Sequence, residues 1–294
     1  MRVVVTGREG QVVRSLVERG SRAGHEIVAL GRPDLDLTAD ADAIEAAIDA
    51  EHPDVLVSAA AYTAVDKAES EPELAFAINE KGAGAVAGAA RILGIPLVHL
   101  STDYVFDGSK ASPYAEQDEP SPAGVYGASK LAGEHAVLAQ QPNSAILRTA
   151  WVYSPFAANF VKTMLRLAVD REEIAVVADQ RGNPTSALDV ADGVLAVAAN
   201  LLGDNDPALR GIFHMTADGD ASWAEFAEWI FEASGRSGGP TARVKRIASA
   251  DYSAAARRPA NSRLDCTKLR HKHGVSLPAW RASAESVVHR LVEN

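Results

Sequence analysis

The first half of the chain alternates short, mainly apolar runs with longer segments whose apolar residues recur at helical spacing. Apolar runs without polar alternation are typical of strands buried on both faces of a parallel sheet. The predicted strands cover residues 2–5, 26–30, 55–58, 96–101 and 144–149. The predicted helices cover residues 11–23, 41–51, 72–93 and 127–140. This alternation predicts right-handed crossovers and an α/β fold with a doubly wound parallel sheet.

After about residue 151 the alternation becomes less regular. Helical spacing recurs over residues 159–169, 188–202, 222–233 and 284–292. Between the last two of these, a segment rich in Gly, Pro, Ser and Arg, 235–278, is predicted to be a long loop. We therefore predict one domain over residues 1–150. Residues 151–294 are expected to form mainly a second, smaller, loop-rich α/β domain that returns elements near 186–205 to the first.

The composition of the 294 residues is that of an ordinary globular protein, with 47% hydrophobic and 23% charged residues. The single cysteine, Cys266, excludes an internal disulfide framework and a thiolate zinc cluster, which fits a reducing compartment. The chain begins with a short apolar strand rather than a secretory leader, and no apolar run reaches the ~18 residues that span a bilayer. We therefore expect a cytoplasmic protein without a membrane partner.

The formal net charge is −10, from 39 acidic and 29 basic residues. A negative surface repels a phosphate backbone, so we expect no nucleic-acid partner. Residues 236–273 depart from this average, because they hold ten Lys or Arg and only two acids, Asp251 and Asp265. The stretch is either a solvated basic loop or a local anion site for one small phosphorylated ligand, and the sequence leaves both interpretations open.

A glycine turn over residues 6–13 joins the first predicted strand to the first predicted helix. Gly7 permits a tight turn, and Gly10 lets the backbone approach a pyrophosphate at the helix N-terminus. This context favours a Rossmann-type, dinucleotide-binding domain over 1–150 and a substrate domain over 151–294, with an ordinary βα turn as the alternative. Val13 replaces the third glycine of the usual spacing, so we expect the helix to pack slightly farther from the sheet.

The end of the second predicted strand bears on the choice of cofactor. Arg32 stands where an NAD-selective site often carries an acid, so it is placed to meet a 2′-phosphate, while Gly31 leaves room for it. This favours NADPH over NADH, with a surface arginine in a turn as the alternative. Asp34 and Asp36 lie close enough along the chain to reach a ribose, which keeps NADH open as a second cofactor.

Three polar residues after the fourth strand form a candidate reacting centre. Thr102 lies at a strand end, where open α/β sheets bind ligands. Tyr126 and Lys130 are four residues apart, so on a helix they share one face. A nearby ammonium favours the phenolate, and we therefore expect Lys130 to lower the pKa of Tyr126 toward a useful range. Thr102 is placed to bind a substrate oxygen.

Together these motifs resemble the extended short-chain dehydrogenase/reductases, and within them the reductases of nucleotide-linked 4-keto-6-deoxy sugars. The matching segments extend over nearly the whole chain: 7–12, 59–69, 101–107, 126–134, 148–153, 159–164, 179–185 and 258–264. The resemblance implies NADPH-dependent reduction of the 4-keto group of dTDP-4-dehydro-L-rhamnose, which gives dTDP-L-rhamnose. It also implies that Tyr126 is the proton donor, with Lys130 as its partner and Thr102 as the third catalytic residue.

The resemblance also implies which residues contact each ligand. For the cofactor they are Gly10, Gln11 and Val12 along the pyrophosphate, Asp36 and Leu37 near the adenine, and Ala61, Tyr62 and Thr63 along the inner half. For the sugar they are Thr102, Asp103 and Trp151. For the nucleotide diphosphate they are Asn159, Phe160, Val161, Arg258 and Arg263, which would give the basic stretch a use. From the sequence pattern alone, Trp151 would instead be a core aromatic residue.

Other interpretations remain open at this stage. A reductase or epimerase of another nucleotide sugar would keep the same fold and the same Tyr126 and Lys130. A noncatalytic, NADP-binding regulatory subunit is a third interpretation, against which the complete catalytic set argues. The resemblance also raises a magnesium ion held by glutamates between subunits. Ser15 and Leu188 stand at two of those positions, so we expect no metal and a monomer or weak homodimer.

Overall fold

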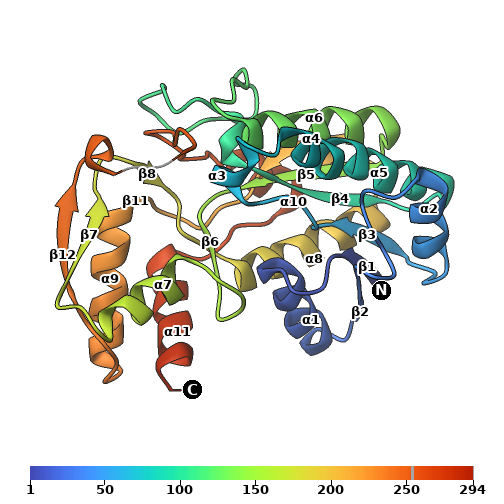
Figure 1. The fold of residues 1–294 in the computed structure, drawn as a ribbon. Coiled ribbons are helices and arrows are strands. Elements are labelled where there is room, and N and C mark those ends of the chain that lie inside the picture. Colours follow the sequence, from blue (N-terminus) through green and yellow to red (C-terminus); the bar gives the residue numbers. More distant parts are fainter. Residues whose placement is uncertain (253–254, 294) are drawn as a thin grey trace.

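The computed structural model describes residues 1–252 and 255–293, and its centre is a six-stranded, wholly parallel sheet in the order β10-β5-β4-β3-β1-β2 (Figure 1). The strands are β1 (Arg2–Thr6), β2 (Glu26–Leu30), β3 (Val55–Ser58), β4 (Leu97–Thr102), β5 (Ser144–Thr149) and β10 (Gly211–His214). The residues of β3, β4 and β5 are all buried, as expected for central strands covered on both faces of a parallel sheet. The predicted fold class, a doubly wound Rossmann-type α/β sheet, is confirmed.

Helices cover both faces of this sheet. One face packs against α1 (Gln11–Arg22), α8 (Ala187–Gly203) and α10 (Thr267–His273), through a core that includes Leu16, Val194 and Leu269. The other packs against α2 (Ala41–Asp49), α5 (Ala83–Ile92) and α6 (Val125–Gln140), through a core that includes Ile44 and Val86. Because α8 lies beside α1 and β10 extends the sheet, elements from the second half of the chain complete the first lobe.

The second lobe is smaller and lies to one side of the sheet, where β7, β12 and α9 are drawn in Figure 1. Its helices are α7 (Phe160–Ala168), α9 (Trp223–Arg236) and α11 (Trp280–Val292). Its strands form three short pairs: β7 (Glu173–Val177) with β12 (Arg243–Ile247), β8 (Arg181–Gly182) with β11 (Ala221–Ser222), and β6 (Val152–Tyr153) with β9 (Thr185–Ser186). Its own hydrophobic core is rich in aromatic residues, including Tyr153, Phe226 and Trp280.

Two predicted elements differ from the structure. The segment 235–278 is not one long loop, because it contains β12, the 3₁₀ turn η4 (Ser249–Asp251) and α10. β12 escapes the hydrophobic pattern because it is a mostly polar edge strand, paired only with β7. The predicted helix 72–93 is divided into α4 (Pro72–Phe76), the π-helical turn η1 (Ala77–Gly82) and α5. The remaining short elements are α3 (Val65–Ala68), η2 (Asp103–Val105) and η3 (Pro207–Leu209).

The π-helical turn has a visible cause at Asn79. Its amide accepts a hydrogen bond from the backbone N–H of Tyr62 at 2.8 Å and donates to the Tyr62 carbonyl at 3.1 Å. It also donates to Ser129 Oγ on α6 at 2.9 Å. π-helical turns occur frequently at functional sites, where they redirect a side chain. Here one buried amide fixes the segment after β3 against the helix that carries Tyr126.

Candidate active site

A cavity of about 680 Å³ opens at the carboxyl ends of β1, β3, β4 and β5 and runs along the glycine turn. Many of the residues predicted for the site line it: Gly7, Gly10, Gln11, Val12, Ala61, Thr63, Thr102, Asp103, Tyr126, Lys130 and Trp151. A second hollow of about 530 Å³ shares Gly7 and Ala61 with the first. It is lined by the remaining predicted cofactor residues, Arg32, Asp36, Leu37 and Tyr62. The two hollows together follow the path of an extended ligand.

The glycine turn brings the N-terminus of helix α1 to this cavity. Gly7 has φ +103°, which glycine adopts without strain, and its N–H donates to the Leu30 carbonyl. Helix α1 begins at Gln11; Gly10 supplies no side-chain cap, and the first turn has no acidic residue. An uncapped helix N-terminus attracts an anion. Val13, where a third glycine was expected, is almost fully buried and packs against Gly7.

At the outer hollow, the structure adds one residue that sequence reasoning missed. Arg8 follows Gly7 directly and lines the hollow with Arg32, and its guanidinium is paired with Asp34. Arg8 and Asp34 are both well exposed, with 42% and 58% of their side chains accessible. Hydrogen bonds from Thr38 lower the pKa of Asp36, which holds its carboxylate ionised beside Arg32. The charged side chains that line the hollow are thus Arg8, Arg32 and Lys67 on the basic side and Glu9, Asp36 and Glu71 on the acidic side.

Tyr126 lies in the first turn of α6, and the close approach of this turn to η2 requires a glycine at the next position. A Cβ on Gly127 would lie 2.1 Å from the Tyr104 carbonyl oxygen. Burial raises the pKa of the Tyr126 phenol to about 12, and its hydrogen bond with the Thr102 hydroxyl offsets only part of that rise. The expectation that Lys130 lowers this pKa is therefore wrong for this structure.

The reason is the position of the Lys130 ammonium. It donates to the Leu100 carbonyl at 2.7 Å and lies 3.5 Å from Nε2 of His99. Lys130 is only 3% exposed, and this burial lowers its pKa to about 8. His99 is also buried, which lowers its pKa far below the usual value, and its Nδ1 lies 3.0 Å from Ser58 Oγ. The lysine thus sits in a polar recess behind the tyrosine.

Asp103 is a further acid-base group in the cavity whose pKa departs strongly from its usual value. Its carboxylate accepts a hydrogen bond from Thr102 Oγ1 at 3.1 Å, while its second oxygen has no geometrically complete hydrogen bond among the described residues. Burial raises its pKa to about 6, and the nearby hydroxyls of Ser262 and Thr102 oppose the rise. A buried carboxylate that lacks a donor on one oxygen is suited to accept one from a ligand hydroxyl.

On the substrate side, Trp151 lies between the lobes in a left-handed conformation with φ +48°. Its indole stacks on Trp223, with ring centroids 3.6 Å apart. The ring centroids of Phe160 and Trp223 are 4.6 Å apart. Trp151 lines the cavity and is only partly buried, so it is not simply a core aromatic residue. Gln11 ties this region to the glycine turn, because its amide donates to the Val152 carbonyl and accepts from Ser154 Oγ.

Three residues predicted for the nucleotide-diphosphate end have structural roles in place of cavity contacts. Asn159 caps α7: its side chain accepts from the Lys162 N–H and donates to the carbonyls of Ser154 and Phe156. Val161 is fully buried in the second core, so its side chain is not available to a ligand. Phe160 packs against the same core. Their neighbours Ala157 and Ala158 line the cavity instead.

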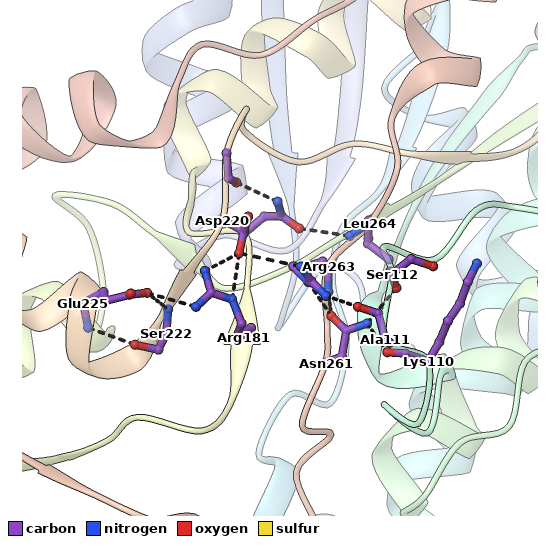
Figure 2. A network of polar contacts seen from close by, with 12 residues as sticks. Lys110, Ala111, Ser112, Arg181, Asp220, Ser222, Glu225, Asn261, Arg263 and Leu264 are labelled. Carbon is purple, nitrogen blue, oxygen red and sulfur yellow. Dashed lines mark hydrogen bonds and ion pairs between the residues drawn. The ribbon is translucent and has the colours of Figure 1, made fainter.

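Arg258 and Arg263 lie in a segment that joins the two lobes. Arg258 pairs with Asp66 at 2.7 Å and is close to Tyr104. Figure 2 shows Arg263 beside Asn261 and the carbonyl of Ala111, within a network that continues through Asp220 to Arg181 and Glu225. Both arginines are therefore already engaged with protein groups, and neither lines the two hollows described above.

Three of the eight other basic residues of this stretch are paired with acids, so part of it is held against the protein surface. Arg236 pairs with Glu232 one turn earlier on α9 and with Glu285 on α11, Arg243 pairs with Glu173, and Arg246 pairs with Glu228. Within residues 1–252 and 255–293, no three His, Cys, Asp or Glu side chains gather as metal ligands would. The Ser15 hydroxyl donates a hydrogen bond to the Gln11 carbonyl, and Leu188 packs beside the second core.

No helix in the described part of the chain has the length and apolarity to cross a membrane.

The comparisons with known proteins agree with this geometry. Residues 1–293 match the family model described as the RmlD substrate binding domain. The chain is 50% identical, over 99% of its length and 98% of the relative's, to the dTDP-4-dehydrorhamnose reductase of Sinorhizobium fredii. It is similar to the crystal structure of such a reductase from Clostridium acetobutylicum, with a TM-score of 0.91, 36% identity and 99% coverage of both chains. It is also similar to the crystal structure of the Bacillus anthracis dTDP-4-dehydrorhamnose reductase in complex with NADP, with a TM-score of 0.90 and 36% identity. That match covers 97% of this chain and 98% of the other.

Proposed function

The chain belongs to the dTDP-4-dehydrorhamnose reductase family, and from this premise we propose that it reduces the 4-keto group of dTDP-4-dehydro-L-rhamnose with NADPH to give dTDP-L-rhamnose. The observation that carries the proposal is that Thr102, Tyr126 and Lys130 line the same cavity as the glycine turn. A carbonyl placed there lies beside a phenol and within reach of a cofactor held along the turn. The protein is thus an NADP-dependent oxidoreductase of dTDP-rhamnose synthesis.

The residues of the two hollows fit NADPH. The uncapped start of α1, without an acid in its first turn, would hold the pyrophosphate. Arg8 and Arg32 would hold the 2′-phosphate, and the hollow that contains Asp36 and Leu37 would take the adenosine. The bound cofactor supplies the hydride for sugar C4. The protein supplies position and a proton.

In the mechanism that we propose, Tyr126 donates its phenolic proton to the C4 oxygen. Its high pKa keeps the phenol fully protonated at neutral pH, and the emerging alkoxide is a stronger base than phenolate. Thr102, which already hydrogen-bonds Tyr126, would orient the carbonyl. Lys130, which lines the same cavity, would donate a hydrogen bond to the cofactor ribose. The side chains of Asp103 and Trp151 would contact the sugar.

The deciding experiment follows NADPH oxidation by absorbance, with dTDP-4-dehydro-L-rhamnose generated in a coupled reaction. We expect one sugar reduced for each NADPH consumed, and slower turnover with NADH. NADPH binding without turnover would overturn the proposal in favour of another nucleotide sugar or a regulatory subunit. An epimerase would be recognised by a changed sugar with no net loss of NADPH.

Three finer points belong to this proposal. We expect the dTDP-sugar to be the only partner that the reaction requires, with no nucleic acid or membrane, because the net charge is −10. We propose a monomer or weak homodimer, since Ser15 and Leu188 replace carboxylates that would bridge subunits through a metal. We also propose a cytoplasmic location, which agrees with a single, unpaired cysteine, Cys266.

A further inference from the structure

Three side chains behind the catalytic group form a compact polar cluster: Ser101, Glu134 and Arg148. The Glu134 carboxylate accepts hydrogen bonds from Ser101 Oγ at 2.5 Å and from Arg148 Nε and Nη2 at 2.9 and 2.6 Å. The exposed fractions of the Arg148 and Glu134 side chains are 1% and 0%. The mechanism above gives none of these three residues a role, although a buried ion pair is costly to desolvate.

The placement of Glu134 links it to both parts of the catalytic group. It lies one helical turn beyond Lys130 and two beyond Tyr126, so the three share one face of α6. Ser101 and Arg148 are direct cross-strand neighbours on β4 and β5, and the next pair in the register is Thr102 with Thr149. The Glu134 carboxylate therefore binds Ser101 and Arg148, each of which comes directly before a residue of the Thr102–Thr149 pair.

Arg148 also contacts the chain on the C-terminal side of Thr102. Its guanidinium lies over the ring of Phe106, 5.1 Å from the centroid, and Phe106 stacks on Tyr114 at 4.2 Å. Phe106 ends the short turn that begins at Asp103. The chain is thus held just before Thr102 through Ser101 and four residues after it through Phe106.

The charge of Glu134 also reaches Lys130. The groups that act on the ammonium are His99 on β4, whose Nε2 lies 3.5 Å away, and Glu134 one turn along its own helix. His99 is neutral, and Arg148 on β5 is paired with Glu134. Glu134 is the group that favours the charged form of the buried lysine. Without its negative charge, the buried ammonium would lose that support.

From this geometry we propose that Glu134 is a positioning residue for the reduction. Through Ser101 it fixes the Thr102 hydroxyl against Tyr126, and through its charge it keeps Lys130 an ammonium. The inference rests on the proposed function, because it assigns Glu134 to the catalytic group of that reaction. It predicts that disturbing the cluster lowers turnover more than it disturbs cofactor binding.

The mildest test is Ser101→Ala, with Ser144→Ala as the matched control. Ser144 is a fully buried serine at the start of β5 whose hydroxyl has no hydrogen-bond partner among the described residues. We expect Ser101→Ala to lower kcat about tenfold while the Kd of NADPH stays within about twofold, because the loss acts on the transition state. Ser144→Ala should keep the wild-type kcat. Wild-type kcat in Ser101→Ala would overturn the positioning role.

The charge is tested separately with Glu134→Gln and Glu134→Asp. Glu134→Gln should move the alkaline limb of kcat/KM about one pH unit lower, because the lysine then loses its proton more readily. Glu134→Asp keeps the charge but shortens its reach, so the limb should stay while kcat falls. An unshifted alkaline limb in Glu134→Gln would overturn the electrostatic part of the proposal.

If Glu134→Gln does not fold, the kcat values of Ser101→Ala and Glu134→Asp decide whether Glu134 is a positioning residue. An inactive wild-type enzyme would overturn the proposed function itself, whereas an active one with unaffected variants would overturn only this inference.

Discussion

The two ends of the proposed cofactor path differ in how they use charge. At the inner end, Lys130 and Asp103 are buried and Tyr126 is half-buried. Loss of solvent raises the pKa of Tyr126 to about 12 and of Asp103 to about 6, and lowers the pKa of Lys130 to about 8. At the outer end, Arg8 and Asp34 are paired at the surface and surrounded by water. Burial makes each inner group depend on a few neighbours, whereas solvent screens the outer ones. We therefore expect single substitutions to change turnover strongly at the inner end and affinity moderately at the outer end.

The strongest test of the comparison is Tyr126→Phe at the inner end. Removing the proton donor should lower kcat about 10²- to 10⁴-fold, the usual contribution of general acid catalysis. The Kd of NADPH should stay within about twofold, since the phenyl ring still fills the cavity. Stopped-flow or steady-state NADPH oxidation measures the first quantity, and NADPH fluorescence titration the second.

Tyr153→Phe is the control for this variant. Tyr153 is fully buried, and its hydroxyl donates to the Trp280 carbonyl in the second lobe, away from the cavity. It should retain wild-type kcat. If Tyr126→Phe also retained it, Tyr126 would not be the proton donor.

The next test uses pH and Lys130. Because the folded pKa of Lys130 is about 8, the ammonium is present below that value and lost as pH rises through it. We expect wild-type kcat/KM to be level near neutral pH and to fall above pH ~8. Lys130→Met should lower kcat/KM about 10²-fold and abolish this limb. A limb that persists in Lys130→Met would have to belong to another group.

Much of the first lobe could be predicted because its elements carry strong local signals. The mainly apolar segments of β3 and β5 gave their bounds directly, and the glycine turn placed the start of α1. β12 could not be found in the same way, since exposed charged residues and a single strand partner leave it without an apolar pattern. The π-helical turn depends on Asn79 contacts with Tyr62 and Ser129, which lie far apart in the sequence.

In the candidate site, too, local spacing could be predicted from the sequence, whereas contacts between distant segments could not. Spacing placed Tyr126 and Lys130 on one face of a helix, but it could not show that the ammonium turns toward Leu100 and His99. That direction depends on the register of β4 beneath α6. Asn159 and Val161 were expected at the ligand because of the resemblance, and only the packing of α7 shows that one caps a helix and the other is core. A matching motif identifies a segment more reliably than the role of each side chain in it.

At the outer end, Arg32→Ala should weaken NADPH binding about tenfold, while NADH binding should change less than about twofold. A hydrogen bond to a charged group contributes roughly 1.5–3 kcal/mol, and NADH lacks the phosphate that would receive it. The ratio of kcat/KM for the two cofactors measures the effect. Arg166→Ala, an exposed arginine on α7, serves as the control. An unchanged ratio would show that Arg8 alone, or neither arginine, meets the 2′-phosphate.

The smallest effect is expected from Asp34→Asn, which leaves Arg8 without its carboxylate. An exposed ion pair contributes about 0–1 kcal/mol, so releasing the guanidinium should tighten NADPH binding by no more than about fivefold. The change should be greatest at low ionic strength and vanish in high salt, because the groups involved are solvent-exposed. Titrations of NADPH and NADH at two salt concentrations test this directly. If NADH binding tightened equally, Asp34 would act on the ribose that both cofactors share, and Arg8 would not distinguish between them.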